Sequence, residues 1–320
     1  MTLKNQEEQR VLVIGGTGHY GQNIVRSLLH MNVKVRILTR NENNVRRLFA
    51  DRVEIVKGSI EDREALQKAF SGVDRIVYSI SAMAVDQIRR LEQIEQFAVI
   101  NSMDLAKDAG IKRIVYISVF EVNLAFAAAH RLAVASEKAV VEEYIRNSGF
   151  NWTILGAPPS MEIFFTMIHG NSMLVPGGGP AALPTISPVD VGEIAAQAVI
   201  RNDLHGLRIK MVGPRAYSFP DAADRISKTW GRTIHFRKIP IFLPRLAYLL
   251  FSPFTHFSDR ILYVHTLLGF VRLLNNFPQG YISEIGKLHD MLLSTFAFRA
   301  STIEMEAERR MNCQGTKEDS

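Results

Sequence analysis

The chain has little cysteine and no long apolar run. A single cysteine, Cys313, occurs among 320 residues, so no disulfide can form within the chain. This is typical of a reducing compartment, and we predict a cytoplasmic protein. No apolar stretch reaches the roughly 18 uncharged residues of a membrane-spanning helix. The opening MTLKNQEEQR is polar and lacks the apolar core of a signal peptide.

Long runs of one charge sign are also absent. Lys and Arg number 38 against 32 Asp and Glu, which gives a net charge of +6. Such an excess can attract nucleic acid. The basic residues are scattered, however, and form no long cluster, which argues against direct nucleic-acid binding. We also predict no metal site.

What the chain does contain is a repeated alternation of short apolar runs and helical patterns, from residue 10 to about residue 200. The runs are rich in β-branched residues and apolar on both faces, as in parallel strands covered by helices on both sides. They are RVLVIGG, KVRILTR, VEIVKG, DRIVYSIS, KRIVYISV and NWTILGA. Helical spacing occurs in GQNIVRSLLHM, EDREALQKAF, IEQFAVINSMDLAKDAG and HRLAVASEKAVVEEYIRNSGF. Asp62 is predicted to cap the start of one of these helices, and Gly110 and Gly149 are predicted to end two others. The alternation predicts an α/β fold with a doubly wound, Rossmann-like parallel sheet.

The texture of the sequence changes after Gly156, where the turn-rich segments GAPPSM and VPGGGPAALP begin a different region. We therefore expect a Rossmann-like domain with a small C-terminal lobe and a helical C-terminal extension. The predicted divisions are a polar tail over 1–9, the Rossmann-like domain over 10–156, a small substrate lobe over 157–238, a helical extension over 239–311 and a frayed tail over 312–320.

The segment VLVIGGTGHYGQNIV has the pattern of a strand, a glycine turn and a helix start. Gly16, Gly18 and Gly21 fit G-x-G-x-x-G, and Gly15, Gly18 and Gly21 fit G-x-x-G-x-x-G. Glycines allow the backbone to turn tightly and to approach a pyrophosphate at the helix N-terminus. Because the motif lies in the first β-α unit of a predicted parallel sheet, it predicts a dinucleotide site.

The second predicted strand ends in ILTRN, where a carboxylate would accept hydrogen bonds from the ribose of NAD. This chain has Thr39 and Arg40 instead, and an arginine suits a 2′-phosphate. NADP(H) is therefore the favoured cofactor, with NAD(H) as the alternative. Arg36 and Arg46 could replace Arg40 in this role, or Arg40 could be a solvated surface residue.

Six segments in order carry a family resemblance. They are GGTGHYGQNIVRSLL, VEIVKGSIEDREALQKAFSGVDRIVYSIS, DLAKDAGIKRIVYIS, EKAVVEEYIRNSGFNWTIL, ISPVDVGEIAAQAV and VGPRAYSFPDAADRIS. Together they resemble the NmrA-like, atypical branch of the short-chain dehydrogenase/reductase (SDR) superfamily, from residue 10 to about residue 235. The resemblance implies an NAD(P) site with three parts. In it Gly15, Thr17, Gly18, Tyr20 and Gly21 would hold the pyrophosphate, Arg40 the adenosine phosphate, and Ser79, Ile80 and Ser81 the inner ribose region.

The resemblance also implies catalytic positions, one of which is changed. Reductases of the superfamily use a Tyr-x-x-x-Lys helix and a serine, and here Ser118 and Lys138 match the serine and the lysine, while Val134 stands in the tyrosine position. Three interpretations follow. Lys138 holds the cofactor ribose without chemistry, or His130 or another group donates the proton, or Lys138 is a surface residue paired with Glu142 at i,i+4.

The extension over 239–311 is rich in leucine and aromatic residues, as in FLPRLAYLLF and FSDRILYVHTLLGFVRLL. Amphipathic helices of this kind most often pack on their own core. An apolar surplus would instead indicate peripheral association with a membrane or with a protein complex.

From these features we predict an NADP(H)-binding oxidoreductase that acts on a small apolar carbonyl or quinone-like substrate without the usual catalytic tyrosine. The alternative is a non-catalytic NAD(P)-binding protein, either a redox sensor or an assembly factor for a membrane redox complex.

Overall fold

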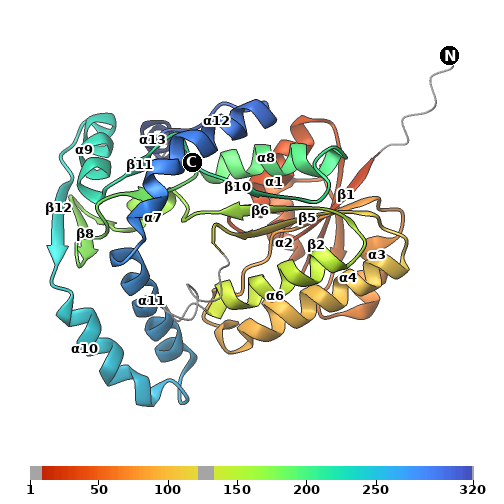
Figure 1. Cartoon of the computed structure of the whole chain (residues 1–320), viewed down its shortest axis with the longest axis horizontal. Coiled ribbons are helices and arrows are strands. Elements are labelled where there is room, and N and C mark those ends of the chain that lie inside the picture. Colours follow the sequence, from red (N-terminus) through yellow and green to blue (C-terminus); the bar gives the residue numbers. More distant parts are fainter. Residues whose placement is uncertain (1–8, 122–132, 319–320) are drawn as a thin grey trace. The chain divides into compact units, whose positions relative to one another are not determined.

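A computed structural model of the chain describes residues 9–121 and 133–318, which form two compact units (Figure 1). Unit 1 comprises the described residues up to 121 together with 133–156 and 191–210. Unit 2 comprises 157–190 and 211–318.

Unit 1 is built on a seven-stranded sheet with the order β10-β6-β5-β4-β1-β2-β3. The strands are β1 (Arg10–Ile14), β2 (Lys34–Thr39), β3 (Glu54–Lys57), β4 (Arg75–Tyr78), β5 (Arg113–Val119), β6 (Asn151–Ala157) and β10 (Leu207–Lys210). Strand β1 pairs in parallel with both β2 and β4, so that Ile14 lies opposite Leu38 on one side and Tyr78 on the other. The strand order reverses here, between β1 and β4. The predicted doubly wound, Rossmann-like sheet is confirmed, and all six predicted runs are strands.

Helices cover both faces of this sheet (Figure 1). Helices α3 (Arg63–Phe70), α4 (Val99–Asp108) and α6 (Ala133–Asn147) pack with Leu12, Ile76 and Tyr116 into one core. Helix α1 (Gly21–His30) lies on the other face, together with the part of α8 (Pro188–Ile200) that belongs to unit 1. The two come so close that a Cβ on Gly192 would lie 2.6 Å from the backbone carbon of Asn23. Burial on both faces explains the continuous apolar runs of the central strands, such as Val11–Ile14 in β1 and Ile114–Ile117 in β5.

Three predicted helix-end signals are confirmed. Asp62 caps α3, where its carboxylate accepts a hydrogen bond from the backbone N–H of Ala65 at 3.0 Å. Gly110 and Gly149 follow α4 and α6 with φ of +80° each, as the predicted glycine stops require. Helix α2 (Glu42–Phe49) was not predicted, because only Val45 and Phe49 are buried on it and its apolar pattern is short.

Unit 2 has a separate core. Its strands are β7 (Ile168–His169), β8 (Ser172–Pro176), β9 (Leu183–Pro184), β11 (Ala216–Tyr217) and β12 (His235–Ile239). Its helices are α7 (Glu162–Thr166), α9 (Phe219–Trp230), α10 (Phe242–Phe251), α11 (Asp259–Asn275), α12 (Ile285–Thr295) and α13 (Ile303–Glu318). Phe164 packs edge-on against both Tyr217 and Phe219 at the centre of this core. The buried carboxylate of Asp190 accepts hydrogen bonds from the backbone and hydroxyl of Ser301, which joins the segment before α13 to the start of α8.

The two units differ from the predicted divisions in two places. Residues 191–210 belong to unit 1 and not to a lobe over 157–238, because β10 pairs in parallel with β6 of the large sheet. Residues 312–318, predicted as part of a frayed tail, continue α13. The polar composition of residues 312–318 did not distinguish the end of a helix from an irregular tail. Over the described part of the chain, no helix combines the length and apolarity needed to cross a membrane.

Candidate functional site

The glycine turn after β1 leaves the backbone without side-chain cover. Gly15 has φ of +85°, and the N–H of Gly18 donates to its carbonyl at 2.9 Å. Gly21 begins α1, and a Cβ on it would lie 2.0 Å from the carbonyl oxygen of Gly15. The first turn of α1 carries no acidic residue, and Tyr20 provides no side-chain cap. A turn of this shape, at the positive end of a ten-residue helix, favours an anion.

The segment after β4 lies directly beside this turn. The backbone N–H of Ser79 donates to the carbonyl of Ile14 at 2.9 Å, and a Cβ on Gly15 would lie 2.1 Å from the carbonyl of Ser79. Ser79 and Ile80 are half-buried, and Ser81 is exposed. The predicted phosphate and ribose segments therefore meet at the carboxyl edge of the sheet, where the strand order reverses. Open α/β sheets bind their ligands at such points.

Arg40 follows β2 and is exposed. In the amide orientation that satisfies its hydrogen bonds, Gln87 faces Arg40 with its side-chain oxygen. This oxygen accepts a hydrogen bond from Nη1 of Arg40 at 2.7 Å. The two alternative arginines meet carboxylates instead. Arg36 pairs with Glu54 and also donates to backbone carbonyls, while Arg46 donates to the carboxylate of Asp51 at 3.1 Å. Arg40 is thus the arginine of the three that faces a neutral partner in the described structure.

Lys138 is buried inside unit 1, with a solvent-exposed fraction of 5%. Its Nζ lies 2.9 Å from Oε2 of Glu95. It also donates to the carbonyl of Ile80 at 3.3 Å and to the hydroxyl of Tyr116 at 3.4 Å. The interpretation of Lys138 as a surface residue paired with Glu142 is wrong.

Glu142 forms a different buried pair. Its carboxylate accepts from Arg146 at 2.7 Å and from Arg208 at 2.8 Å, and it is fully buried. Helix α6 therefore carries two buried charges that share no partner: Lys138 pairs with Glu95, and Glu142 pairs with two arginines.

Glu95 was missed by the sequence analysis. It lies in a π-helical segment, Gln93–Ala98, that leads into α4, and its carboxylate is fully buried. Oε1 accepts from the backbone N–H of Ala82 at 2.8 Å, so Glu95 links Lys138 to the segment after β4. A signal was present in the sequence, because Glu95 continues a buried row through Val99, Ser102 and Ala106 at helical spacing. Single π-helical turns are frequent at functional sites.

The charge states at this position follow from burial and pairing. Burial alone lowers the pKa of Lys138, but the carboxylate of Glu95 and the hydroxyl of Tyr116 outweigh it and raise the pKa above its ordinary value. Burial raises the pKa of Tyr116 to about 12, although the positive charge of Lys138 opposes this. Lys138 is therefore a fixed cation at neutral pH, and Tyr116 stays neutral.

The remaining predicted catalytic positions differ in what surrounds them. Ser118 lies on β5 and is 3% exposed, and its hydroxyl has no hydrogen-bond partner among the described residues. Buried hydroxyls are rarely left unpaired, so this one is a candidate to contact a ligand. Val134 is half-buried on α6, one turn before Lys138. His130 lies outside the described residues.

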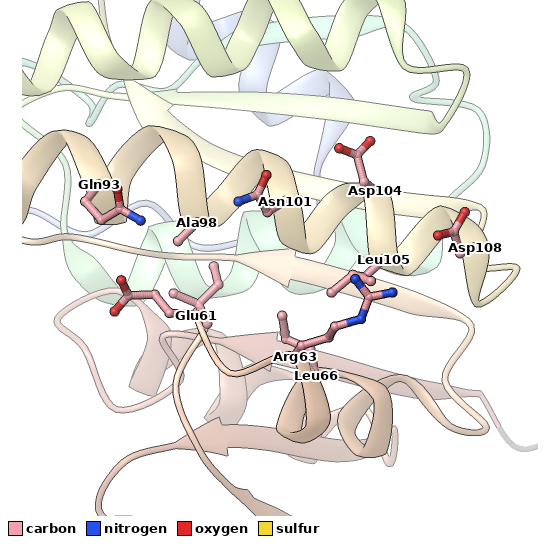
Figure 2. A pocket seen from close by; sticks show the side chains of 10 residues that line it. Glu61, Arg63, Leu66, Gln93, Ala98, Asn101, Asp104, Leu105 and Asp108 are labelled. Carbon is pink, nitrogen blue, oxygen red and sulfur yellow. The ribbon is translucent and has the colours of Figure 1, made fainter.

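A hollow of about 410 Å³ opens near α3 and α4 (Figure 2). It is lined by Ile60, Glu61, Arg63, Leu66, Gln93, Ala98, Asn101, Asp104, Leu105 and Asp108. None of the predicted site residues is among them. Three of the side chains are carboxylates, those of Glu61, Asp104 and Asp108, and they would repel a pyrophosphate. The hollow is therefore distinct from the glycine turn.

The chain matches the family model described as "NmrA-like family" over residues 7–259. It belongs to the NmrA-like family. The resemblance read from the sequence motifs is thereby confirmed. The matched range covers the described residues of unit 1 and reaches the first residue of α11 in unit 2.

Individual relatives and solved structures of similar fold have diverse names. A photosystem II assembly factor, Ycf39, from Synechocystis is 24% identical over 81% of this chain and 80% of its own. An NAD(P)H azoreductase from Xenophilus azovorans is 23% identical over 72% of this chain and 77% of its own. The structure of an NADPH-dependent quinone oxidoreductase from Escherichia coli, solved with NADPH, aligns with a TM-score of 0.66 at 17% identity, over 94% of this chain and 99% of that one. At this identity the structural likeness shows the fold.

Proposed function

We propose that this chain is an NADP(H)-dependent oxidoreductase whose cofactor lies on the glycine turn, residues 79–81 and Arg40. The observation that carries the proposal is the close approach of Gly15 to the carbonyl of Ser79, where a Cβ would come within 2.1 Å. It brings the glycine turn and residues 79–81 together at the carboxyl edge of the sheet, where such sheets bind their ligands. Arg40 supplies the positive charge that a 2′-phosphate requires. The NADPH complex of the Escherichia coli oxidoreductase and the name of the Xenophilus relative support the choice of cofactor. When bound, NADPH supplies a hydride.

The replacement Arg40→Ala tests the cofactor choice. Loss of a charge-assisted hydrogen bond costs about 1.5–3 kcal/mol, so NADPH affinity should fall about ten- to a hundredfold while NADH affinity stays unchanged. Titration of both dinucleotides by intrinsic fluorescence measures this. Arg46→Ala is the matched control, since Arg46 is also exposed and donates to the carboxylate of Asp51. Equal binding of NADPH and NADH to both the wild type and Arg40→Ala would contradict the assignment.

The acceptor class follows from the missing phenol. Val134 cannot donate a proton, and Lys138 is held by Glu95. An acceptor that becomes a ketone-derived alkoxide would need a strong local donor, because an alkoxide is a strong base. A quinone becomes a hydroquinone anion, which is a phenolate like that of tyrosine with a conjugate-acid pKa of about 10. It can take its proton from water. We therefore favour a quinone-like acceptor over a simple carbonyl, the reaction consuming one hydride and one solvent proton per hydroquinone formed.

Ser118 is proposed to donate its hydroxyl hydrogen bond to the acceptor oxygen. Ser118→Ala should leave NADPH affinity and thermal stability unchanged, because the hydroxyl has no partner to lose among the described residues. Quinone turnover should fall about tenfold or more. Ser102→Ala is a matched control, since the hydroxyl of this other buried serine donates to the carbonyl of Val99 at 2.8 Å. It should lower stability by about 1 kcal/mol without changing turnover.

Two observations favour a second candidate, a non-catalytic NADP(H)-binding protein. Lys138 is held by Glu95 rather than presented to a substrate, and the chain has a relative named as an assembly factor. The two candidates differ in NADPH oxidation. Suppose that NADPH binds but that a panel of quinones, azo dyes and flavins does not oxidise it faster than in buffer alone. The chain is then a non-catalytic binding protein.

A further inference from the structure

Helix α10 presents its apolar stripe to solvent. Its exposed side chains are Phe242, Leu243, Leu246, Leu249 and Leu250, with exposed fractions of 61, 47, 50, 68 and 58%. Their spacing of i, i+1, i+4, i+7 and i+8 places them on one face of the helix. Such a face normally points toward a protein core. Here it lies on the outside of unit 2, where an apolar patch indicates an interaction surface.

The exposed apolar residues continue into the turn after α10. Phe254, at 52% exposed, lies in the short 3₁₀ helix Ser252–Phe254, and Phe257 follows at 82%. Val264 and Leu267 on α11 are also 40 and 39% exposed, but their helical spacing from His265 places them on the side of α11 away from α10. We call residues 242–267 the apolar hairpin (α10 and α11 in Figure 1).

The two helices of the apolar hairpin pack against each other. The ring of Tyr248 on α10 stacks on that of His265 on α11, with 3.9 Å between their centroids. The contact uses the side of α10 opposite to its exposed leucines, as the helical spacing of Tyr248 from Leu246 and Leu250 requires. The packing of α10 on α11 therefore leaves the apolar stripe of α10 facing solvent.

Positive charge accompanies the apolar hairpin. Residues 237–275 contain Arg237, Lys238, Arg245, Arg260 and Arg272, and their only acidic residue is Asp259. Arg237, Lys238 and Arg260 are exposed. A surface that combines exposed Phe and Leu with flanking Lys and Arg is complementary to an anionic lipid surface, where each basic residue adds attraction to the headgroups.

We propose that the α10 face of the apolar hairpin, together with the turn that follows it, inserts into the interface of an anionic lipid bilayer, with α10 lying in the plane of that surface. Helix α10 has ten residues and is about 15 Å long, which is half of the roughly 30 Å hydrocarbon core. It can therefore bury its stripe without crossing. A second copy of the chain suits this surface less well, because a two-fold interface would bring the same cationic residues together.

Co-flotation of the full-length protein with vesicles tests the proposal. The protein should float with vesicles of phosphatidylcholine mixed with phosphatidylglycerol, float less with phosphatidylcholine alone, and lose binding as salt is added. The triple variant Leu246→Asn, Leu249→Asn, Leu250→Asn should reduce the vesicle-bound fraction at least about tenfold, because three apolar side chains no longer leave water. Its NADPH affinity should not change.

The matched control is Met291→Asn, Leu293→Asn on α12, whose side chains are also exposed, at 46 and 45%, but lie outside the apolar hairpin. It should float like the wild type. The proposal is overturned if the wild type floats with neither vesicle, or if the triple variant floats as well as the wild type. It is also overturned in favour of a second copy if light scattering finds a dimer that the triple variant converts to monomer, without vesicle binding by either.

Discussion

Replacing Glu95 by glutamine is expected to lower the free energy of unfolding by about 3–5 kcal/mol near neutral pH, the usual cost of leaving one charge of a buried pair without its partner. The glutamine has nearly the shape of the glutamate, so packing changes little. The ammonium of Lys138 would keep its contacts with the carbonyl of Ile80 and the hydroxyl of Tyr116. It would lose the carboxylate that lies 2.9 Å away.

The same replacement should make stability depend on alkaline pH. In the wild type the pKa of Lys138 is raised by Glu95 against the effect of burial, so the stabilisation persists up to the unfolded value of about 10.4 and is lost only above it. Without Glu95, burial dominates and lowers the folded pKa below that of the unfolded chain. The unfolded state then binds more protons, and stability rises with pH between the two pKa values. Urea unfolding at about pH 7 and about pH 9.5 should show a partial recovery in the variant that the wild type lacks.

Glu142→Gln is the matched control for this experiment. Glu142 is also fully buried on α6, but its partners Arg146 and Arg208 are arginines. An arginine does not lose its proton in this range, so this variant should be destabilised at both pH values without recovery. If Glu95→Gln behaved in the same way as Glu142→Gln, the proton of Lys138 would not be the cause.

The seven-stranded sheet could be predicted from the sequence because each of its signals is local. An apolar strand such as Arg113–Val119 shows in seven consecutive residues that both faces are covered. The glycine turn is equally local, since Gly15, Gly18 and Gly21 lie within one strand-turn-helix unit. Asp62 could be identified as a cap because its partner, Ala65, lies three residues away.

The surroundings of Lys138 could not be predicted in the same way. Its partner Glu95 lies on a different helix, and no spacing rule connects the two residues. An i,i+4 rule suggested Glu142, which is paired instead with Arg208 from the far edge strand of the sheet. The unpaired hydroxyl of Ser118 is likewise a property of three-dimensional surroundings. Sequence motifs thus identified positions, while the charge partners depended on contacts between distant segments.

The boundary between the two units was also a non-local property. The turn-rich texture after Gly156 marks where the chain leaves unit 1, but no comparable signal marks its return at Val191. Strand β10 returns to the sheet because β6 offers an edge with which Ile209 can pair beside Leu155. A pairing between strands so far apart in the chain cannot be read from either strand alone.

The replacement Gly15→Ala should both destabilise unit 1 and weaken NADPH binding. An alanine at φ of +85° carries a backbone cost of about 1–2 kcal/mol. Its Cβ would also lie 2.1 Å from the carbonyl oxygen of Ser79. Relief of that collision requires a backbone shift, and overpacking of this kind costs about a further 1–3 kcal/mol. The glycine turn and residues 79–81 form the proposed cofactor-binding site. The backbone shift should therefore lower NADPH affinity at least about tenfold, equivalent to about 1.4 kcal/mol.

Gly110→Ala separates the two causes. Gly110 has φ of +80°, nearly that of Gly15, but a Cβ built on it meets no described atom within 4 Å. It should therefore show the backbone cost of about 1–2 kcal/mol and bind NADPH like the wild type. Urea unfolding and NADPH titration of the two variants provide the comparison. An equal loss of stability in both variants would mean that the close approach of Gly15 to Ser79 is relieved without cost. If Gly15→Ala left NADPH affinity unchanged, the glycine turn would not be part of the cofactor site, even if the variant were less stable.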